Sequence, residues 1–228
     1  MSLLTELIQQ LSASANPEKA LAMQAYMKDK FVFFGVKAPQ RQEILKNLVK
    51  EYKPQLDRPT LIQICKDCYA QPQRELHYCG MELITRFLKK KFQKEDIDFI
   101  TFLITTHSWW DTVDMICKHH LGNYLKLYPE QIPEVIKAYS NSGKLWLQRS
   151  AILFQLEYKE ETDQNLLFAL CKKHKDTKEF FMNKAIGWAL REYSKSNPQA
   201  VIDFVASNEL APLSKKEALR KIPFVMLN

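Results

Sequence analysis

A carboxylate and an indole stand four residues apart at Trp110 and Asp114. This is the spacing of one helical turn, so both side chains are expected on one face of a helix. Arg149 follows Asp114 after 35 residues, and Trp188 lies further along the chain. Indole faces attract cations, a carboxylate supplies a counter-charge, and an arginine binds phosphate through two parallel hydrogen bonds. Together these residue types could stabilise a cation beside a phosphate backbone, such as the oxocarbenium-like sugar formed when a glycosidic bond breaks.

The four tryptophans also have a structural interpretation, because tryptophans at helical spacing usually pack in a core. We therefore assign Trp109 and Trp146 to the core. Trp110 and Trp188 share their expected helix faces with charged residues, which favours a place for these two in a site.

Helix signals recur along the whole chain. Apolar residues step by three and four, as in Leu3, Leu7 and Leu11, and sustained strand-like alternation is absent. The segment 214–217 has the Ser-x-x-Glu spacing of a capping box. The pattern predicts an all-α protein of roughly twelve short helices. Proline at a first-turn position marks helix starts in Asn16-Pro17-Glu18, Ala38-Pro39-Gln40, Gln71-Pro72, Tyr128-Pro129-Glu130 and Asn197-Pro198.

A faint internal repeat indicates how these helices are organised. The segment 149–154 resembles the segment 183–188 at an offset of 34 residues. A period of this length, with one helix pair per unit, is typical of an α-solenoid of HEAT-like repeats, which is curved and binds extended partners on its concave face. Asp114 and Arg149 are equivalent in this register and should line one surface. The alternative for these two residues is an exposed ion pair that stabilises the fold by about 0–1 kcal/mol.

The net charge of +7 is distributed unevenly. Residues 95–169, which include Asp114, carry six basic and 11 acidic side chains, whereas residues 86–94 carry five basic and none acidic. Residues 170–228 carry 11 basic and six acidic side chains. This layout favours basic flanks that bind a polyanion in a concave groove, while the acidic centre has another task; a solvated helix surface is the alternative.

Other classes of site have little support. Five glycines in 228 residues leave no Gly-rich phosphate loop. The five histidines form no H-E-x-x-H motif, and the pair Cys65 and Cys68 has no second pair at zinc spacing, so we expect neither a metal nor a cofactor.

The amino-terminal residues do not read as a signal peptide, and no apolar run is long enough to cross a membrane, so we expect an intracellular protein with no membrane partner. No Pro-, Gly- or Ser-rich linker interrupts the chain, which favours a single domain over residues 1–228.

The sequence resembles the AlkD-type DNA alkylation repair glycosylases, a bacterial family of HEAT-like repeat proteins. The resemblance covers nearly the whole chain. The motifs that carry it are Asn16-Pro17-Glu18-Lys19, Phe34-Gly35-Val36-Lys37-Ala38-Pro39, Ser108-Trp109-Trp110-Asp111-Thr112-Val113-Asp114, Trp146-Leu147-Gln148-Arg149, Lys184-Ala185-Ile186-Gly187-Trp188-Ala189-Leu190-Arg191-Glu192-Tyr193 and Asn208-Glu209-Leu210-Ala211-Pro212-Leu213-Ser214.

The resemblance implies a function and the roles of individual residues. Asp114 would be the catalytic carboxylate, Trp110 and Trp188 would flank the deoxyribose of the lesion, and Arg149 would bind the DNA backbone. The implied substrates are N3- and N7-alkylated purines in duplex DNA, namely 3-methyladenine and 7-methylguanine, whose positive charge makes them good leaving groups without a general acid. The same resemblance implies further DNA contacts at Tyr26, Lys37, Arg41, Lys184 and Arg191.

Relatives in this family can carry glutamine at the position of Lys37. The resemblance also implies action on DNA without a base-reading pocket. The resemblance further implies a monomer in the bacterial cytoplasm. Two other functions stay open on the sequence alone: a non-catalytic HEAT-like module that binds bent, branched or damaged DNA, and a solenoid that binds another protein.

Overall fold

The computed structural model describes residues 2–223 and 225, which form helices joined by short segments. Within these residues no β-strand occurs, and the extended pairing is limited to one isolated bridge between Val32 and Gln73. The prediction of an all-α protein is therefore confirmed. The chain divides into two compact units, residues 1–91 and 92–228, and each is described by itself. The single-domain organisation, the solenoid and its concave groove stay predictions.

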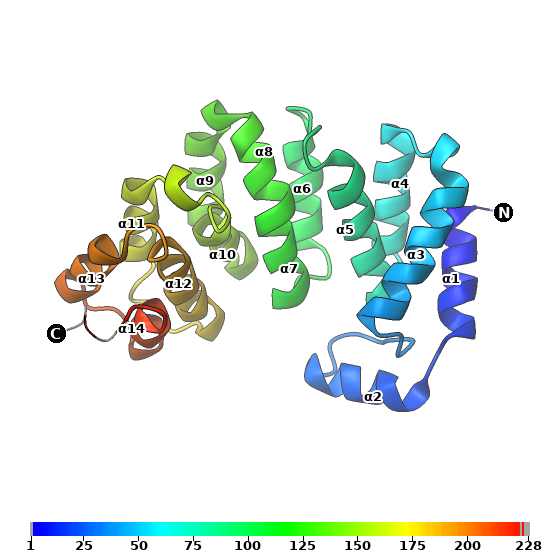
Figure 1. Ribbon diagram of the computed structural model, residues 1–228, viewed down its shortest axis with the longest axis horizontal. Coiled ribbons are helices and arrows are strands. Elements are labelled where there is room, and N and C mark those ends of the chain that lie inside the picture. The colour runs from blue at the N-terminus through cyan, green and yellow to red at the C-terminus, as the bar shows by residue number, and fades with distance from the viewer. Residues whose placement is uncertain (1, 224, 226–228) are drawn as a thin grey trace. The chain divides into compact units, whose positions relative to one another are not determined.

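The first unit is built from α1, α2, α3, α4 and α5. Figure 1 shows α1, α3, α4 and α5 beside one another, whereas α2 runs across the ends of its neighbours. Their apolar stripes form the core of this unit, with Leu7, Leu48 and Leu83 almost fully buried. The bounds are α1 Leu3–Ala13, α2 Pro17–Tyr26, α3 Ala38–Tyr52, the 3₁₀ turn η1 Lys53–Gln55, α4 Arg58–Tyr69 and α5 Arg74–Leu88.

The segment between α2 and α3 is fixed by a buried carboxylate. Glu75 of α5 is fully buried and accepts hydrogen bonds from the backbone N–H groups of Phe34 at 3.1 Å, Gly35 at 2.9 Å and Val36 at 3.1 Å. On the other side, the N–H of Asn16 donates to the carbonyl of Phe34 at 2.9 Å. These bonds hold the chain rigidly as it enters α3, immediately before Lys37.

Gly35 is required in this segment for two reasons, and its replacement by alanine is expected to destabilise the protein. Its φ of +87° lies in the left-handed region, and an added Cβ would stand 2.1 Å from the carbonyl oxygen of Asn16. We expect Gly35→Ala to lower the free energy of unfolding by more than about 2 kcal/mol in urea denaturation. Gly143→Ala is the matched control, because Gly143 has a φ of +67° with no atom within 4 Å of an added Cβ. Equal losses in the two variants would show that the close approach to Asn16 costs nothing.

The second unit contains the remaining helices. In Figure 1, α7 and α8 form one continuous helical run, and α10, α12 and α14 follow one another as neighbours. The bounds are α6 Asp96–Thr105, α7 Trp110–Ile116, the π-helical turn η2 Cys117–Leu121, α8 Gly122–Leu127, η3 Pro129–Gln131, α9 Ile132–Asn141, α10 Leu145–Leu153, η4 Lys159–Glu161, α11 Gln164–Lys173, α12 Phe180–Tyr193, α13 Pro198–Ser207 and α14 Pro212–Leu219.

Most of the helix starts marked by proline are confirmed. Asn16 caps α2 by accepting from the N–H of Lys19 at 2.9 Å, and Asn197 caps α13 in the same way. The starts at Pro39 and Pro129 also hold, although Pro129 opens a 3₁₀ turn. The start at Gln71-Pro72 is wrong, because α5 begins at Arg74, whose N–H donates to the carbonyl of Val32.

The capping box at residues 214–217 is also wrong. Helix α14 begins at Pro212, so Ser214 lies inside the helix. Its hydroxyl donates to the backbone carbonyl of Asn183 in α12 at 2.9 Å. Glu217 likewise does not cap the helix start and pairs with side chains of α12. Contacts with another helix have therefore replaced the local capping that the spacing suggested.

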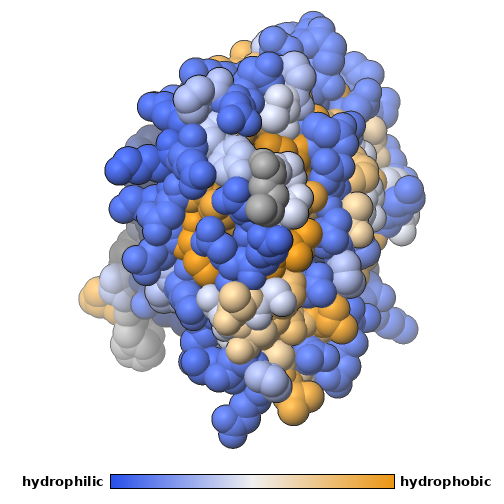
Figure 2. Space-filling model, turned by 90° about the vertical axis from the view of Figure 1, so that its right-hand side faces the viewer, coloured by the Kyte–Doolittle hydropathy of each residue, from blue (hydrophilic) through white to orange (hydrophobic). Residues whose placement is uncertain are grey.

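The surface, the helix lengths and the cysteines bear on the classes of site considered for this chain. Figure 2 shows a predominantly hydrophilic face with smaller hydrophobic areas between the polar side chains. Among the described residues, no helix is both long and apolar enough to span a membrane, and no cluster of three or more His, Cys, Asp or Glu side chains could hold a metal. All five cysteines are free and buried, and burial raises the pKa of Cys79 and Cys117 to about 12.

Candidate active site

Asp114 and Arg149 form a buried, two-pronged ion pair within the second unit. The Nε of Arg149 donates to Oδ1 of Asp114 at 2.8 Å, and Nη2 donates to Oδ2 at 2.9 Å. The side chains are 15% exposed for Asp114 and 4% for Arg149. The repeat register predicted that the two residues line one surface, and the structure brings them together from α7 and α10. The alternative of an exposed ion pair is wrong, since the pair is largely removed from water.

Arg149 also ties a third helix to the pair. Its Nη1 donates to the backbone carbonyl of Phe181, in the first turn of α12. Three of the five N–H donors of the guanidinium are thus directed at groups within the protein. Contact of Arg149 with DNA stays a prediction. In the structure, this side chain joins α7, α10 and α12 around Asp114.

Beside the ion pair, three aromatic side chains pack together at the starts of these helices. The ring centroids of Trp109 and Trp146 are 5.6 Å apart, and Phe181 lies 5.1 Å and 5.2 Å from them. Edge-to-face and tilted aromatic contacts of this kind add to the energy of burial. Trp109 and Trp146 therefore pack against each other and Phe181, but both are half-buried, so their assignment to the core is confirmed only in part.

Burial and the arginine act in opposite directions on the carboxyl group of Asp114. Burial raises its pKa above the ordinary value, because the ionised form loses its hydration, while the hydrogen bonds and charge of Arg149 lower it. The net direction is upward. Each carboxylate oxygen has two lone-pair sites, so the pair with Arg149 leaves further acceptor capacity on an anion that is only partly exposed.

Trp110 and Trp188 are both half-buried. Trp110 begins α7 and precedes Asp114 by one turn, so the two share a helix face, as predicted. Trp188 lies in α12 and lines a cavity of about 360 Å³. Lys118, one turn after Asp114, lines the same cavity, which therefore brings Trp188 and the helical run of Asp114 to one hollow of the second unit.

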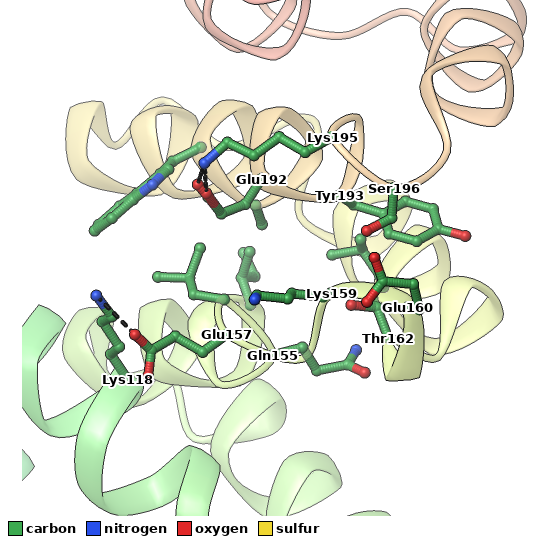
Figure 3. A pocket seen from close by; sticks show the side chains of 15 residues that line it. Lys118, Gln155, Glu157, Lys159, Glu160, Thr162, Glu192, Tyr193, Lys195 and Ser196 are labelled. Carbon is green, nitrogen blue, oxygen red and sulfur yellow. Dashed lines mark hydrogen bonds and ion pairs between the residues drawn. The ribbon is translucent and has the colours of Figure 1, made fainter.

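The walls of this cavity carry charges of both signs. Figure 3 shows Lys118 and Glu157 on one wall, where their side chains pair at 2.9 Å, and Glu192 with Lys195 on the opposite wall. Lys159 extends between the two walls. None of these five residues was singled out from the sequence, because their relation depends on helices that are far apart along the chain.

The other predicted DNA contacts lie in very different environments. Tyr26 is 67% exposed at the end of α2, and Lys37 is exposed at the residue that precedes α3. Arg41 is buried, and its Nη2 pairs with Glu82 at 2.7 Å. Lys184 and Arg191 are both paired with Glu217. Contact of these five residues with DNA stays a prediction, and Tyr26 and Lys37 are the two of them that are exposed rather than buried or half-buried.

The sequence-family comparison decides the class of protein. A family model described as DNA alkylation repair enzyme matches residues 7–222. The chain belongs to the DNA alkylation repair enzyme family. No curated protein matches it. A solved structure described as "Predicted DNA alkylation repair enzyme from Enterococcus faecalis" is 34% identical, with a TM-score of 0.84, and the match covers 92% of this chain and 97% of that chain. A role in alkylation repair and DNA as the partner thus follow from the family, as the resemblance implied.

Proposed function

We propose that this member of the alkylation repair family is a monofunctional DNA glycosylase acting on N3- and N7-alkylated purines in duplex DNA. The observation that carries the proposal is the buried carboxylate of Asp114, which lies one helical turn from Trp110 and whose ionised form is favoured by Arg149. An anion with little hydration interacts strongly with a nearby cation, because the local dielectric constant is low. Such a group suits a reaction in which positive charge develops on a sugar.

The proposed reaction breaks the bond between C1′ of the deoxyribose and N9 of the purine. The electron pair of this bond leaves with the base, whose positive charge it neutralises, and the sugar becomes oxocarbenium-like. Asp114 and the indole faces of Trp110 and Trp188 stabilise this cation. Water then adds to C1′ and loses a proton, which yields a free base and an abasic site. No general acid is needed, since the leaving base is already cationic.

The binding of DNA is proposed to follow the charge layout of the chain. Basic side chains on a concave surface of a HEAT-like solenoid would neutralise phosphates, so affinity should fall steeply as salt rises. In this proposal the protein acts as a monomer in the bacterial cytoplasm and uses neither metal nor cofactor.

A second candidate function is a non-catalytic module that binds bent, branched or damaged DNA. It is favoured by the fact that both oxygens of Asp114 accept hydrogen bonds from Arg149, as in a purely structural ion pair. An assay on duplex DNA containing one 7-methylguanine separates the two functions. The glycosylase forms abasic sites that alkali converts to strand breaks, together with free 7-methylguanine. Tight binding without either product would favour the binding module, and salt-independent association would favour a protein-binding solenoid instead.

The excision rate is expected to depend on pH through Asp114. The reaction needs the ionised carboxylate, so the rate should fall as acid protonates it. Because burial raises the pKa of Asp114, the midpoint should lie above the ordinary aspartate value of about 3.9. The measurement is single-turnover release of 7-methylguanine across the acid range, after subtraction of the enzyme-free rate at each pH. A rate that increases on acidification would contradict the role of an ionised Asp114.

A further inference from the structure

Helix α14 lies very close to α12 at Gly187, the residue before Trp188. A Cβ added to Gly187 would stand 2.5 Å from the Cβ of Glu217 and 2.8 Å from the carbonyl oxygen of Ser214. No side chain fits there, so the two helices are in backbone contact, and Figure 1 shows α14 lying against α12. A glycine within a helix otherwise costs stability, which indicates that the close approach itself is required.

Glu217 of α14 spans this contact. Its side chain is 11% exposed, and its Oε1 accepts from Nζ of Lys184 at 2.8 Å while Oε2 accepts from Nη1 of Arg191. Hydrogen bonding from Lys184 and the nearby cations lower the pKa of Glu217 below its ordinary value. The carboxylate is therefore ionised at neutral pH and is bonded to α12 at two points.

The two bonded cations stand on either side of Trp188. Lys184 precedes it by four residues and Arg191 follows it by three, and Gly187 is its direct neighbour. Residues at these spacings share one face of a helix. The indole thus leaves α12 next to both bonded cations, and it lines the cavity of about 360 Å³.

We propose that Glu217 is a positioning residue for Trp188. By bonding to Lys184 and Arg191, it holds in place the two side chains that neighbour the indole on α12, and so fixes the direction of the indole. The inference rests on the proposed function, in which Trp188 must face the sugar. Misplacement of a catalytic side chain by about 1 Å can cost a large factor in rate.

Glu217 also has an electrostatic effect that is separate from positioning. Lys184 and Arg191 place two positive charges beside an aromatic side chain that is proposed to stabilise a cation. Uncompensated, they would disfavour a further positive charge nearby. Their pairing with Glu217 reduces this repulsion while keeping both long side chains in place.

The test uses Glu217→Gln, which keeps the shape of the side chain and removes its charge. Glu209→Gln is the matched control, because Glu209 is exposed and its replacement changes the net charge equally. Three quantities are compared with the wild type: the single-turnover rate of 7-methylguanine release, the affinity for the same duplex, and acrylamide quenching of Trp188. The Trp188 emission is isolated by subtracting the emission of the matching Trp188→Phe proteins.

We expect Glu217→Gln to lower the single-turnover rate by about tenfold or more and to increase the quenching of Trp188, with DNA affinity changed by less than about threefold. Glu209→Gln should leave all three unchanged. An unchanged rate with unchanged quenching would overturn the inference. A lower rate with unchanged quenching would also overturn it, because the effect would then be electrostatic rather than positional.

Two further outcomes keep the inference separate from the proposed function. If the wild type releases no base, the proposed function fails, while the quenching comparison still tests the position of Trp188.

If Glu217→Gln does not stay folded at the assay temperature, Arg191→Gln is measured in its place. This variant removes one of the bonded cations, and the same loss of rate and of protection from acrylamide is expected. If Arg191 serves only to bind phosphate, its replacement would weaken DNA binding and leave quenching unchanged, which would overturn the inference.

Discussion

Replacing Asp114 with asparagine is expected to lower the single-turnover rate of 7-methylguanine release by about 100- to 1,000-fold. The carboxylate is the anion proposed to face the sugar cation, and asparagine removes its charge with almost no change of shape. The amide also cannot accept both hydrogen bonds from Arg149, because its nitrogen is a donor. DNA affinity should change far less than the rate, since Asp114 acts mainly on the transition state.

Asp111→Asn is the matched control for this variant. Asp111 is half-buried in the same helix, three residues earlier, and its replacement removes the same charge. We expect its excision rate to stay within about threefold of the wild type, because it lies outside the pair with Arg149. If Asp114→Asn released base as fast as Asp111→Asn, the proposed role of Asp114 would be wrong.

Replacing Arg149 with methionine is expected to have the largest effect on stability. The change leaves Asp114 buried without its counter-charge and removes the bond to the carbonyl of Phe181. Breaking a buried pair in this way typically costs about 3–5 kcal/mol. Urea denaturation should therefore show a large loss at neutral pH. A loss below about 1 kcal/mol would contradict the burial of this pair.

The same variant should alter the pH dependence of stability and of activity. Without Arg149, burial and the nearby charge of Asp111 act on Asp114 without opposition, so its folded-state pKa rises further. A raised carboxyl pKa favours the folded state in acid, and this contribution is lost as pH rises through the folded-state value. The destabilisation relative to the wild type should therefore shrink on acidification. The pH at which the excision rate falls on acidification should be higher than in the wild type. If Arg149 only contacted phosphate, its replacement would leave that pH unchanged.

Local features of the fold could be predicted from the sequence because they depend on neighbouring residues. Asn16 and Asn197 cap helices through bonds to N–H groups three residues later, and prolines follow both. Helical spacing favoured a packing role for Trp109 and Trp146, whereas their contact with each other could not be predicted. The period of 35 residues between Asp114 and Arg149 predicted one shared surface for them, because neighbouring repeats share a register, and their direct ion pair agrees with that prediction.

Features set by contacts between distant segments could not be predicted. Nothing local distinguishes Arg41 or Lys184 from an exposed cation, yet their partners Glu82 and Glu217 lie 41 and 33 residues away. The serine and glutamate of α14 matched a capping box, and only the packing against Gly187 gives them their different role. A glycine directly before a candidate site tryptophan was the one local sign of that close approach.

The central claim is that the protein excises bases whose positive charge makes them leave without a general acid. It is tested most directly by measuring free-base release from matched duplexes that carry either 7-methylguanine or hypoxanthine, which is uncharged. The account predicts that 7-methylguanine is released at a rate that requires Asp114, and that hypoxanthine stays attached. Release of both bases at similar rates, or of neither, would contradict it.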